Sequence, residues 1–141
     1  MPLFRTTTVL FVAAALGCAQ DARKPAAKDK PVAQAFAIHD VRNQREKAGR
    51  PFLQFLNVPT MRMGLYALPA GGDDKQTPHE DDEVYYVLKG HATLRVESQE
   101  FPVEPGSMVF VPAHTVHKFH SISEPFETLV FFAATPRAAQ R

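Results

Sequence analysis

Residues 71–90 read GGDDKQTPHEDDEVYYVLKG, and this stretch decides the fold prediction. Glu83 directly precedes the apolar run Val84–Leu88, so it opens a predicted strand whose alternate side chains enter a core. A carboxylate inside a core costs free energy unless it is paired, hydrogen-bonded or bound to a cation. His79 and a divalent ion would offset that cost. The nearby pair Asp73-Asp74 follows two glycines and is expected to face water.

A second stretch, residues 106–117, reads GSMVFVPAHTVH and ends on a histidine. Three histidines recur at intervals of three residues in this stretch and just after it, namely His114, His117 and His120. Successive residues of a strand point to opposite faces, so this spacing alternates between the two faces. At most His117 alone, or the pair His114 and His120, therefore faces the interior.

Short apolar runs closed by turn residues fill the chain from residue 50 onward. Runs of this length, rich in Val, Phe, Tyr and Leu, are typical of β-strands. The predicted strands are Phe52–Leu56, Met61–Leu68, Val84–Leu88, Ala92–Val96, Met108–Val111, Val116–Ile122 and Phe126–Ala133. So many short strands predict a sandwich or closed barrel, because strand edges must be covered. We interpret their aromatic residues, Tyr85 among them, as core packing.

Three segments rich in Gly, Pro and polar residues are predicted to be hairpin turns. They are Lys89-Gly90, Ser98-Gln99-Glu100 and Glu104-Pro105-Gly106.

The two quoted stretches resemble a known pair of motifs. Gly71-x5-Thr77-x-His79-x3-Glu83-x6-Gly90 is similar to the first cupin motif, and Gly106-x5-Pro112-x-His114-x2-His117 is similar to the second. The resemblance covers residues 52–133 and implies a single-domain, antiparallel jelly-roll β-barrel of the all-β class. It also implies that His79, Glu83 and His117 hold one divalent metal ion inside the barrel.

Two positions depart from the cupin pattern. Thr77 stands where most metal cupins have their first histidine, and His114 replaces the usual glycine of the second motif. The remaining ligands, two histidines and one carboxylate, resemble the facial arrangement of non-haem iron sites. Gln76 or the Thr77 hydroxyl is a candidate further ligand, directly or through water. The metal is left open among iron, manganese, zinc and nickel, and the alternative is an empty barrel in which these side chains are only hydrogen-bonded.

The N-terminal residues have a different character from the rest of the chain. A short apolar run at Val9–Gly17 predicts a signal peptide over residues 1–19 and hence export to the periplasm or the extracellular space. Two processing routes are open: cleavage after Ala19, or lipidation of Cys18 after a lipoprotein-type signal, which would anchor the chain to a membrane.

The rest of the chain divides into three predicted segments. Residues 20–35 are rich in Ala, Lys and Pro and predict a linker. The barrel domain is predicted over residues 36–135, followed by a tail at 136–141. Within Phe36–Gly49 we expect one strand and a short polar helix, with Asp40 as N-cap and Gly49 as the stop.

The near balance of positive and negative charge argues against nucleic acid as a partner. With 16 basic and 15 acidic residues the chain lacks the concentrated positive charge that nucleic-acid binding needs. Two functions stay open: a metal-dependent enzyme of dioxygenase or isomerase type acting on a small molecule, and a module that binds a small molecule or metal without turnover. Homodimers formed through strand edges are common in this fold class.

Overall fold

The computed structural model describes residues 31–133 and contains one helix and eight strands within them. The elements in chain order are α1 (Ile38–Ala48), β1 (Phe52–Val58), β2 (Met61–Leu68), β3 (Asp82–Lys89), β4 (Ala92–Val96), β5 (Gln99–Val103), β6 (Met108–Val111), β7 (His117–His120) and β8 (Phe126–Ala133).

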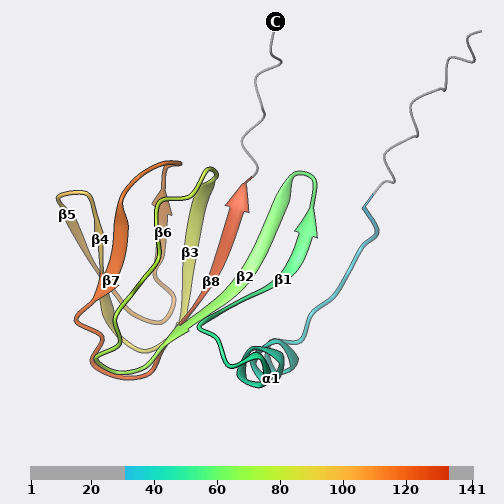
Figure 1. Cartoon of the computed structure of the whole chain (residues 1–141), viewed down its shortest axis with the longest axis horizontal. Coiled ribbons are helices and arrows are strands. Elements are labelled where there is room, and N and C mark those ends of the chain that lie inside the picture. Colours follow the sequence, from blue (N-terminus) through green and yellow to red (C-terminus); the bar gives the residue numbers. More distant parts are fainter. Residues whose placement is uncertain (1–30, 134–141) are drawn as a thin grey trace, which may run out of the picture. The chain divides into compact units, whose positions relative to one another are not determined.

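The strands form two antiparallel sheets (Figure 1). Five strands follow the order β1-β2-β8-β3-β6, and three follow the order β5-β4-β7. The last strand in the chain, β8, lies in the middle of the larger sheet, where it pairs with β2 on one side and β3 on the other. This arrangement confirms the predicted all-β, antiparallel jelly-roll barrel.

The core consists of the inward-facing side chains of both sheets. On β3, Tyr85 and Val87 are buried while Tyr86 between them is exposed, as a period of two requires. Leu94 on β4 and Phe119 on β7 belong to the same buried cluster. The two sheets therefore share one core, and Glu83 points into it because it lies two residues before Tyr85 on the same face of β3.

The β5 strand was missing from the prediction. Val96 pairs with Gln99, so the turn consists of Glu97 and Ser98 only, and Gln99 and Glu100 already belong to the strand. The apolar pattern is weak because four of the five β5 residues are exposed. A strand at a sheet edge with one polar face gives little periodic signal.

Two predicted turns connect different sheets instead of forming hairpins. Gly90 lies between β3 and β4, which belong to separate sheets, and has a φ of 80°. The Glu104-Pro105-Gly106 turn is present, closed by the Ser107 amide donating to the Glu104 carbonyl, but it links β5 to β6 across the sheets.

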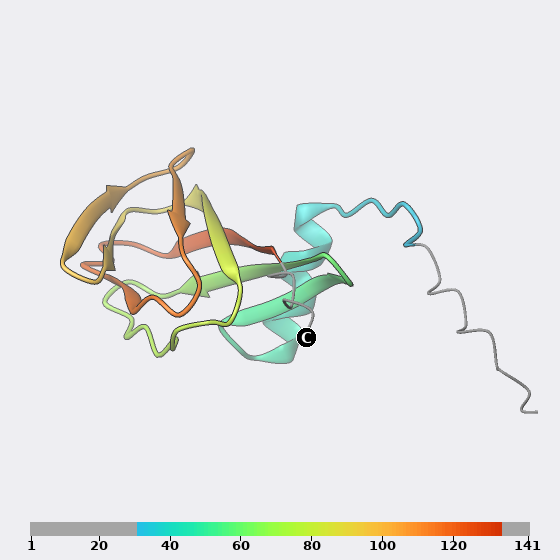
Figure 2. The same cartoon turned by 90° about the horizontal axis from the view of Figure 1, so that it is seen from above.

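The helix α1 contacts β1 and β2, at the end of the molecule far from the smaller sheet (Figure 2). Gly49 ends the helix in the left-handed region at φ 62°, as predicted. The N-cap is Ala37 without a side-chain hydrogen bond, whereas Asp40 lies in the first turn, so the Asp40 N-cap prediction was wrong. The strand expected in Phe36–Gly49 is not present, and residues 31–37 are exposed without regular structure.

Several predictions concern residues outside 31–133. The signal peptide at 1–19, lipidation at Cys18, most of the linker at 20–35 and the tail at 136–141 lie outside the described residues. They stay predictions, as do the exact domain bounds 36–135 and the homodimer. Within the described part of the chain, the helix is too short and too polar to cross a membrane.

Candidate metal centre

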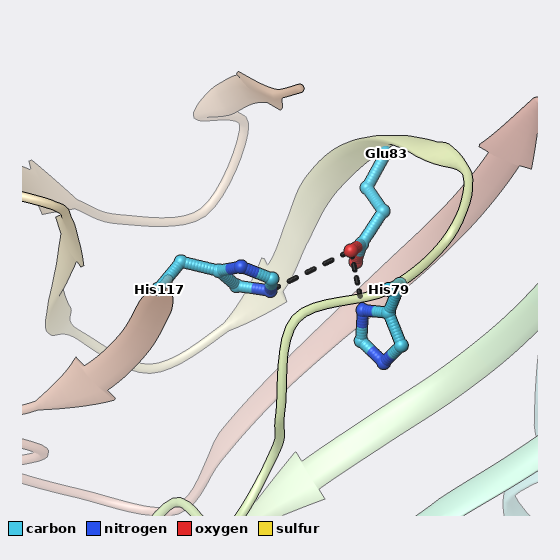
Figure 3. Close-up of side chains that lie close together, drawn as sticks. All are labelled: His79, Glu83 and His117. Atoms are coloured by element: carbon cyan, nitrogen blue, oxygen red, sulfur yellow. Dashed lines mark hydrogen bonds and ion pairs between the residues drawn. The ribbon is translucent and has the colours of Figure 1, made fainter. Parts of the chain in front are cut away.

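Three side chains from separate parts of the fold converge inside the barrel, as Figure 3 shows. They are His79 from the loop between β2 and β3, Glu83 from β3 and His117 from the start of β7. One ligand atom from each lies within 4.8 Å of the others. Donors bound to one ion at about 2.1 Å lie no more than about 4.2 Å apart, so small side-chain rotations would let all three share an ion. This cluster could hold a metal ion.

The fold buries two of these groups almost completely. Glu83 is 1% exposed and His117 is 2% exposed. Glu83 pairs in register with Val111 of β6 and Phe132 of β8, so its strand is covered on both sides. His117 comes from the opposite sheet, and its Nε2 lies 3.6 Å from Glu83 Oε1. The barrel thus supplies one ligand candidate from each sheet.

His79 is half-buried and is held by its backbone and its ring. Its Nδ1 is hydrogen-bonded to Glu83 Oε1. Its carbonyl accepts a hydrogen bond of 2.7 Å from the His114 amide, which ties the first motif to the second. The ring packs edge-on against Phe132, with 5.2 Å between the centroids.

The unusual residue at position 114 adopts the conformation that glycine would have there. His114 has a φ of 61°, in the left-handed region, and its side chain is exposed. The contribution of this position is therefore its backbone amide, which donates to the His79 carbonyl. A histidine is accommodated because its side chain points to solvent.

The cluster has more hydrogen-bond acceptors than protons. His117 Nδ1 lies 2.7 Å from the Thr115 carbonyl, which can only accept, so Nδ1 carries the proton and Nε2 has a free lone pair. The Tyr85 hydroxyl faces three acceptors: Glu83 Oε2 at 2.8 Å, Gln76 Oε1 at 2.9 Å and His117 Nε2 at 3.0 Å. One proton cannot satisfy three acceptors. A cation bound by Glu83 and His117 would use the lone pairs that Tyr85 cannot reach, so the donor set fits a metal ion.

Tyr85 keeps that single proton. Burial raises the pKa of its hydroxyl well above the ordinary value, and the nearby Glu83 carboxylate raises the pKa further. The hydroxyl is thus a donor toward this cluster.

Asp74 is buried, which contradicts the expectation that it faces water. It is 2% exposed, and its carboxylate accepts hydrogen bonds from the Tyr66 hydroxyl at 2.6 Å and from the Phe119 amide at 2.7 Å. It also accepts from the backbone amide and the side-chain Nε2 of Gln76. Burial and the hydrogen bond to Asp74 raise the pKa of Tyr66. Asp73, its neighbour, is exposed as expected.

Gln76 connects Asp74 to the cluster. Its Nε2 donates to Asp74, which fixes the amide so that its carbonyl oxygen faces the Tyr85 hydroxyl. Gln76 therefore lies one hydrogen bond away from Glu83 and His117, through Tyr85. Its role as a metal ligand stays a prediction.

A pocket of about 480 Å³ opens beside the cluster. Pro51, Phe52, Val130 and Phe132 form its apolar walls. Its polar lining includes the side chains of His79, Tyr85 and Gln76, so a small molecule in the pocket would reach the cluster from the His79 side.

Comparison with known proteins places this chain in a family. A protein-family model described as "Cupin domain" matches residues 64–132. The chain is 44% identical over 100 residues to an uncharacterized protein, SCO3923, of Streptomyces coelicolor, and the match covers 71% of this chain and 95% of that protein. The chain belongs to the cupin superfamily.

Solved structures share the cupin fold at low identity. The DMSP lyase DddQ from Ruegeria pomeroyi is 22% identical with a TM-score of 0.57, over 62% of this cupin and 48% of that chain, so this cupin spans about half the length of the lyase. A cupin superfamily protein from Desulfitobacterium hafniense is 19% identical with a TM-score of 0.53, over 60% of this cupin and 76% of that chain. These likenesses concern the fold alone.

The remaining histidines of this cupin lie away from the cluster. His91 is exposed and pairs with Glu124 at 2.6 Å, and His120 pairs with Glu100 at 2.7 Å. Of the two alternatives left open by the histidine spacing, the structure has His117 facing inward.

Sequence reasoning missed the functional contacts of Asp74 and Tyr85. The Asp-x-Gln spacing is a local signal for Asp74, because an Asp side chain commonly accepts from the amide two residues on. Nothing in the sequence marks the Tyr85 hydroxyl, since its ring also fits the core-packing interpretation.

Proposed function

We propose that this cupin binds one divalent transition-metal ion through His79, Glu83 and His117 and acts on a small molecule bound in the adjacent pocket. The observation that carries the proposal is the convergence of the buried Glu83 carboxylate and His117 Nε2 on the single Tyr85 proton, with His79 beside them. A buried carboxylate without a cation would remain costly, because among residues 31–133 only Tyr85 and His79 offer it a proton.

The ligand types favour a transition metal over calcium or magnesium. Two imidazoles and one carboxylate suit iron, manganese, zinc or nickel, whereas hard cations prefer oxygen alone. Such an ion supplies Lewis-acid polarisation of an oxygen-bearing substrate or, if it is redox-active, activation of dioxygen. The Thr115 carbonyl keeps His117 in the tautomer that offers Nε2. The Tyr85 hydroxyl holds a proton beside the same atoms, and apolar side chains form part of the pocket wall.

The test is metal analysis of the full chain, purified without chelator. After separate reconstitution with iron, manganese, zinc, nickel and copper, we expect close to one ion per chain for at least one metal. His79→Ala and His117→Ala should each abolish binding, while His91→Ala, a change of the same kind at an exposed histidine, should leave it unchanged. Circular dichroism establishes that each variant is folded. Substoichiometric metal in every reconstitution of the folded wild-type chain would exclude the proposal.

The alternative function is a module that binds a small molecule or metal without converting it. Metal identity and reactivity separate the two. Tightly bound iron with oxygen consumption on a pocket ligand supports an enzyme of the dioxygenase type, whereas tightly bound zinc without turnover supports the binding module.

We also propose that the chain is exported, on the basis of the apolar run Val9–Gly17 and the small residues that follow it. Intact mass measurement of the full chain expressed in a bacterial host tests this. Cleavage after Ala19 would leave Gln20 as the first residue, and the lipoprotein route would leave a diacylated Cys18 in the membrane fraction. A cytoplasmic product that retains residues 1–19 would contradict export.

A further inference from the structure

We propose that the pocket beside His79 takes a compact aromatic carboxylic acid, whose carboxylate pairs with Arg50 and whose ring lies against Phe52 and Phe132. The inference deepens the proposed function and rests on it, because it assumes that the far end of the molecule approaches an ion held by the cluster.

Apart from His79, the charged side chains that line the pocket are all positive. Two arginines, Arg50 and Arg62, line the pocket, and none of the described residues that line it is an aspartate or glutamate. The whole chain, by contrast, has nearly equal numbers of basic and acidic residues. A pocket with positive charge and no carboxylate attracts an anionic ligand.

The two arginines differ in whether their charge is already paired. Arg62 donates to Asp81 at 2.7 Å, and its guanidinium lies 4.6 Å from the centroid of the Phe132 ring. Within residues 31–133 the structure records no acidic partner for the guanidinium of Arg50. Arg50 is therefore the cation available to a ligand.

Backbone hydrogen bonds around Arg50 fix the position of its Cα, from which the side chain extends. The Arg50 carbonyl accepts from Arg45 Nη1 at 3.3 Å, and the carbonyl of the next residue, Pro51, accepts from the Ala67 amide at 3.0 Å. Neither bond uses the Arg50 side chain. A guanidinium presents a planar fork of donors that matches a carboxylate in a bidentate pair.

The apolar part of the lining selects the body of the ligand. The Phe52 and Phe132 rings lie edge to face, with 6.1 Å between centroids and an interplanar angle of 87°. Such an aromatic wall favours another ring in an edge-on or offset contact. The volume of about 480 Å³ is in the usual range for small-molecule sites and accommodates one substituted ring.

The experiment uses the full chain, loaded with the metal that it binds, and two probes of nearly equal shape. Benzoate carries the carboxylate, and benzamide is its neutral counterpart. Isothermal titration at fixed ionic strength, in a buffer without carboxylates, gives the dissociation constants. We expect benzoate to bind more tightly than benzamide, and Arg50→Gln to weaken benzoate about tenfold while leaving benzamide unchanged.

The matched control is Arg95→Gln, which removes the same charge from an exposed position on β4, outside the pocket. It should leave both probes unaffected. Equal affinity for benzoate and benzamide would overturn the inference. So would a benzoate affinity that does not respond to Arg50→Gln, which would mean that the carboxylate binds the ion alone, or one that falls equally in both variants, which would mean a general effect of charge.

Metal content measured on the same samples separates this inference from the proposed function. A chain that binds benzoate through Arg50 but holds no metal contradicts the proposed function and the link to the cluster. A metal-loaded chain without the Arg50 dependence contradicts only the choice of ligand.

Discussion

Four hydrogen bonds converge on the buried carboxylate of Asp74, and they connect the two ends of the site. One joins β7 through the Phe119 amide and one joins β2 through the Tyr66 hydroxyl. The other two hold Gln76, whose carbonyl accepts from Tyr85. A single side chain therefore orients the hydroxyl that faces Glu83 and His117.

Asp74→Asn tests this role. An amide nitrogen cannot accept, so at least one buried donor loses its partner, and we expect a loss of about 1–3 kcal/mol in the free energy of unfolding. We also expect metal affinity to fall by about tenfold, because groups that orient ligands have effects of that size. Urea unfolding and competition with a chelator measure the two quantities.

Asp73→Asn is the matched control, since Asp73 is the exposed neighbour of the same residue type. It should change neither quantity appreciably. Equal effects of the two substitutions would show that Asp74 acts only through its charge and not through its contacts.

The sequence predicted the residues with a specific chemical signal and missed those whose role depends on the fold. Glu83 was identified because a carboxylate at the start of an apolar strand needs a partner, and His117 because the motif resemblance selected it among three histidines. Asp74 could not be distinguished from Asp73, because burial there depends on β7 approaching from the other sheet. The two preceding glycines led to the same solvent-facing prediction for both carboxylates.

At the scale of strands and helices, the turns between sheets constrain the sequence more than the strands do. Gly90 has a φ of 80°, and a Cβ there would lie 2.6 Å from the Pro125 carbonyl oxygen. The backbone of the β3–β4 connection thus packs directly against the segment that leads into β8. Both the conformation and the close approach require glycine.

Gly90→Ala should therefore destabilise the fold by about 2–4 kcal/mol, from the strained φ together with the clash. Gly106→Ala separates the two causes, because Gly106 has a φ of 93° but no atom within 4 Å of a Cβ. It should cost only the conformational part, about 1–2 kcal/mol. Thermal or urea unfolding of both variants gives the comparison, and a smaller loss for Gly90→Ala than for Gly106→Ala would contradict it.

The helix α1 is joined to the larger sheet by an ion pair. Arg42 donates to both carboxylate oxygens of Glu127 on β8. Its Nη2 donates to Oε1 at 2.6 Å, and its Nε donates to Oε1 at 2.8 Å and to Oε2 at 3.1 Å. Glu127 is 8% exposed, and the hydrogen bonds to it raise the pKa of Arg42. Val41, the preceding residue of α1, is buried.

Arg42→Ala leaves the Glu127 carboxylate buried without its partner. We expect a loss of about 1–3 kcal/mol in the free energy of unfolding, reduced from the value for a fully buried pair because Arg42 is partly exposed. Lys47→Ala, an exposed change on the same helix, should have little effect. If urea unfolding shows equal losses, the ion pair contributes no more than helix propensity.

At this scale the sequence predicted four strands with their observed bounds: Met61–Leu68, Ala92–Val96, Met108–Val111 and Phe126–Ala133. Each has a long or regular apolar run between clear turn residues. The helix cap and the edge strand β5 were not predicted correctly, because a polar helix end and an exposed strand carry no strong periodic signal.

For the whole molecule, an ion held by the proposed ligands would link the two sheets, because Glu83 belongs to one and His117 to the other. Since the unfolded chain does not hold the ligands together, such an ion would bind the folded state and stabilise it. At a free concentration of one hundred times its dissociation constant, the ion adds about 2.7 kcal/mol to the free energy of unfolding.

The thermal midpoint of the wild-type chain should therefore rise by several degrees with the bound metal and fall again with excess chelator. The midpoint of folded His117→Ala should not respond. Differential scanning calorimetry measures both, and an unchanged wild-type midpoint at saturating metal would argue against an ion joining the sheets.

The position of β8 also determines when during biosynthesis the barrel is able to form. It is the last described strand in the chain, yet it lies between β2 and β3 and supplies backbone partners to both. Until Phe126–Ala133 has left the ribosome, β2 and β3 have no strand to join them, and the nascent polypeptide stays open. The larger sheet is therefore completed only after the whole span from β1 to β8 has been synthesised.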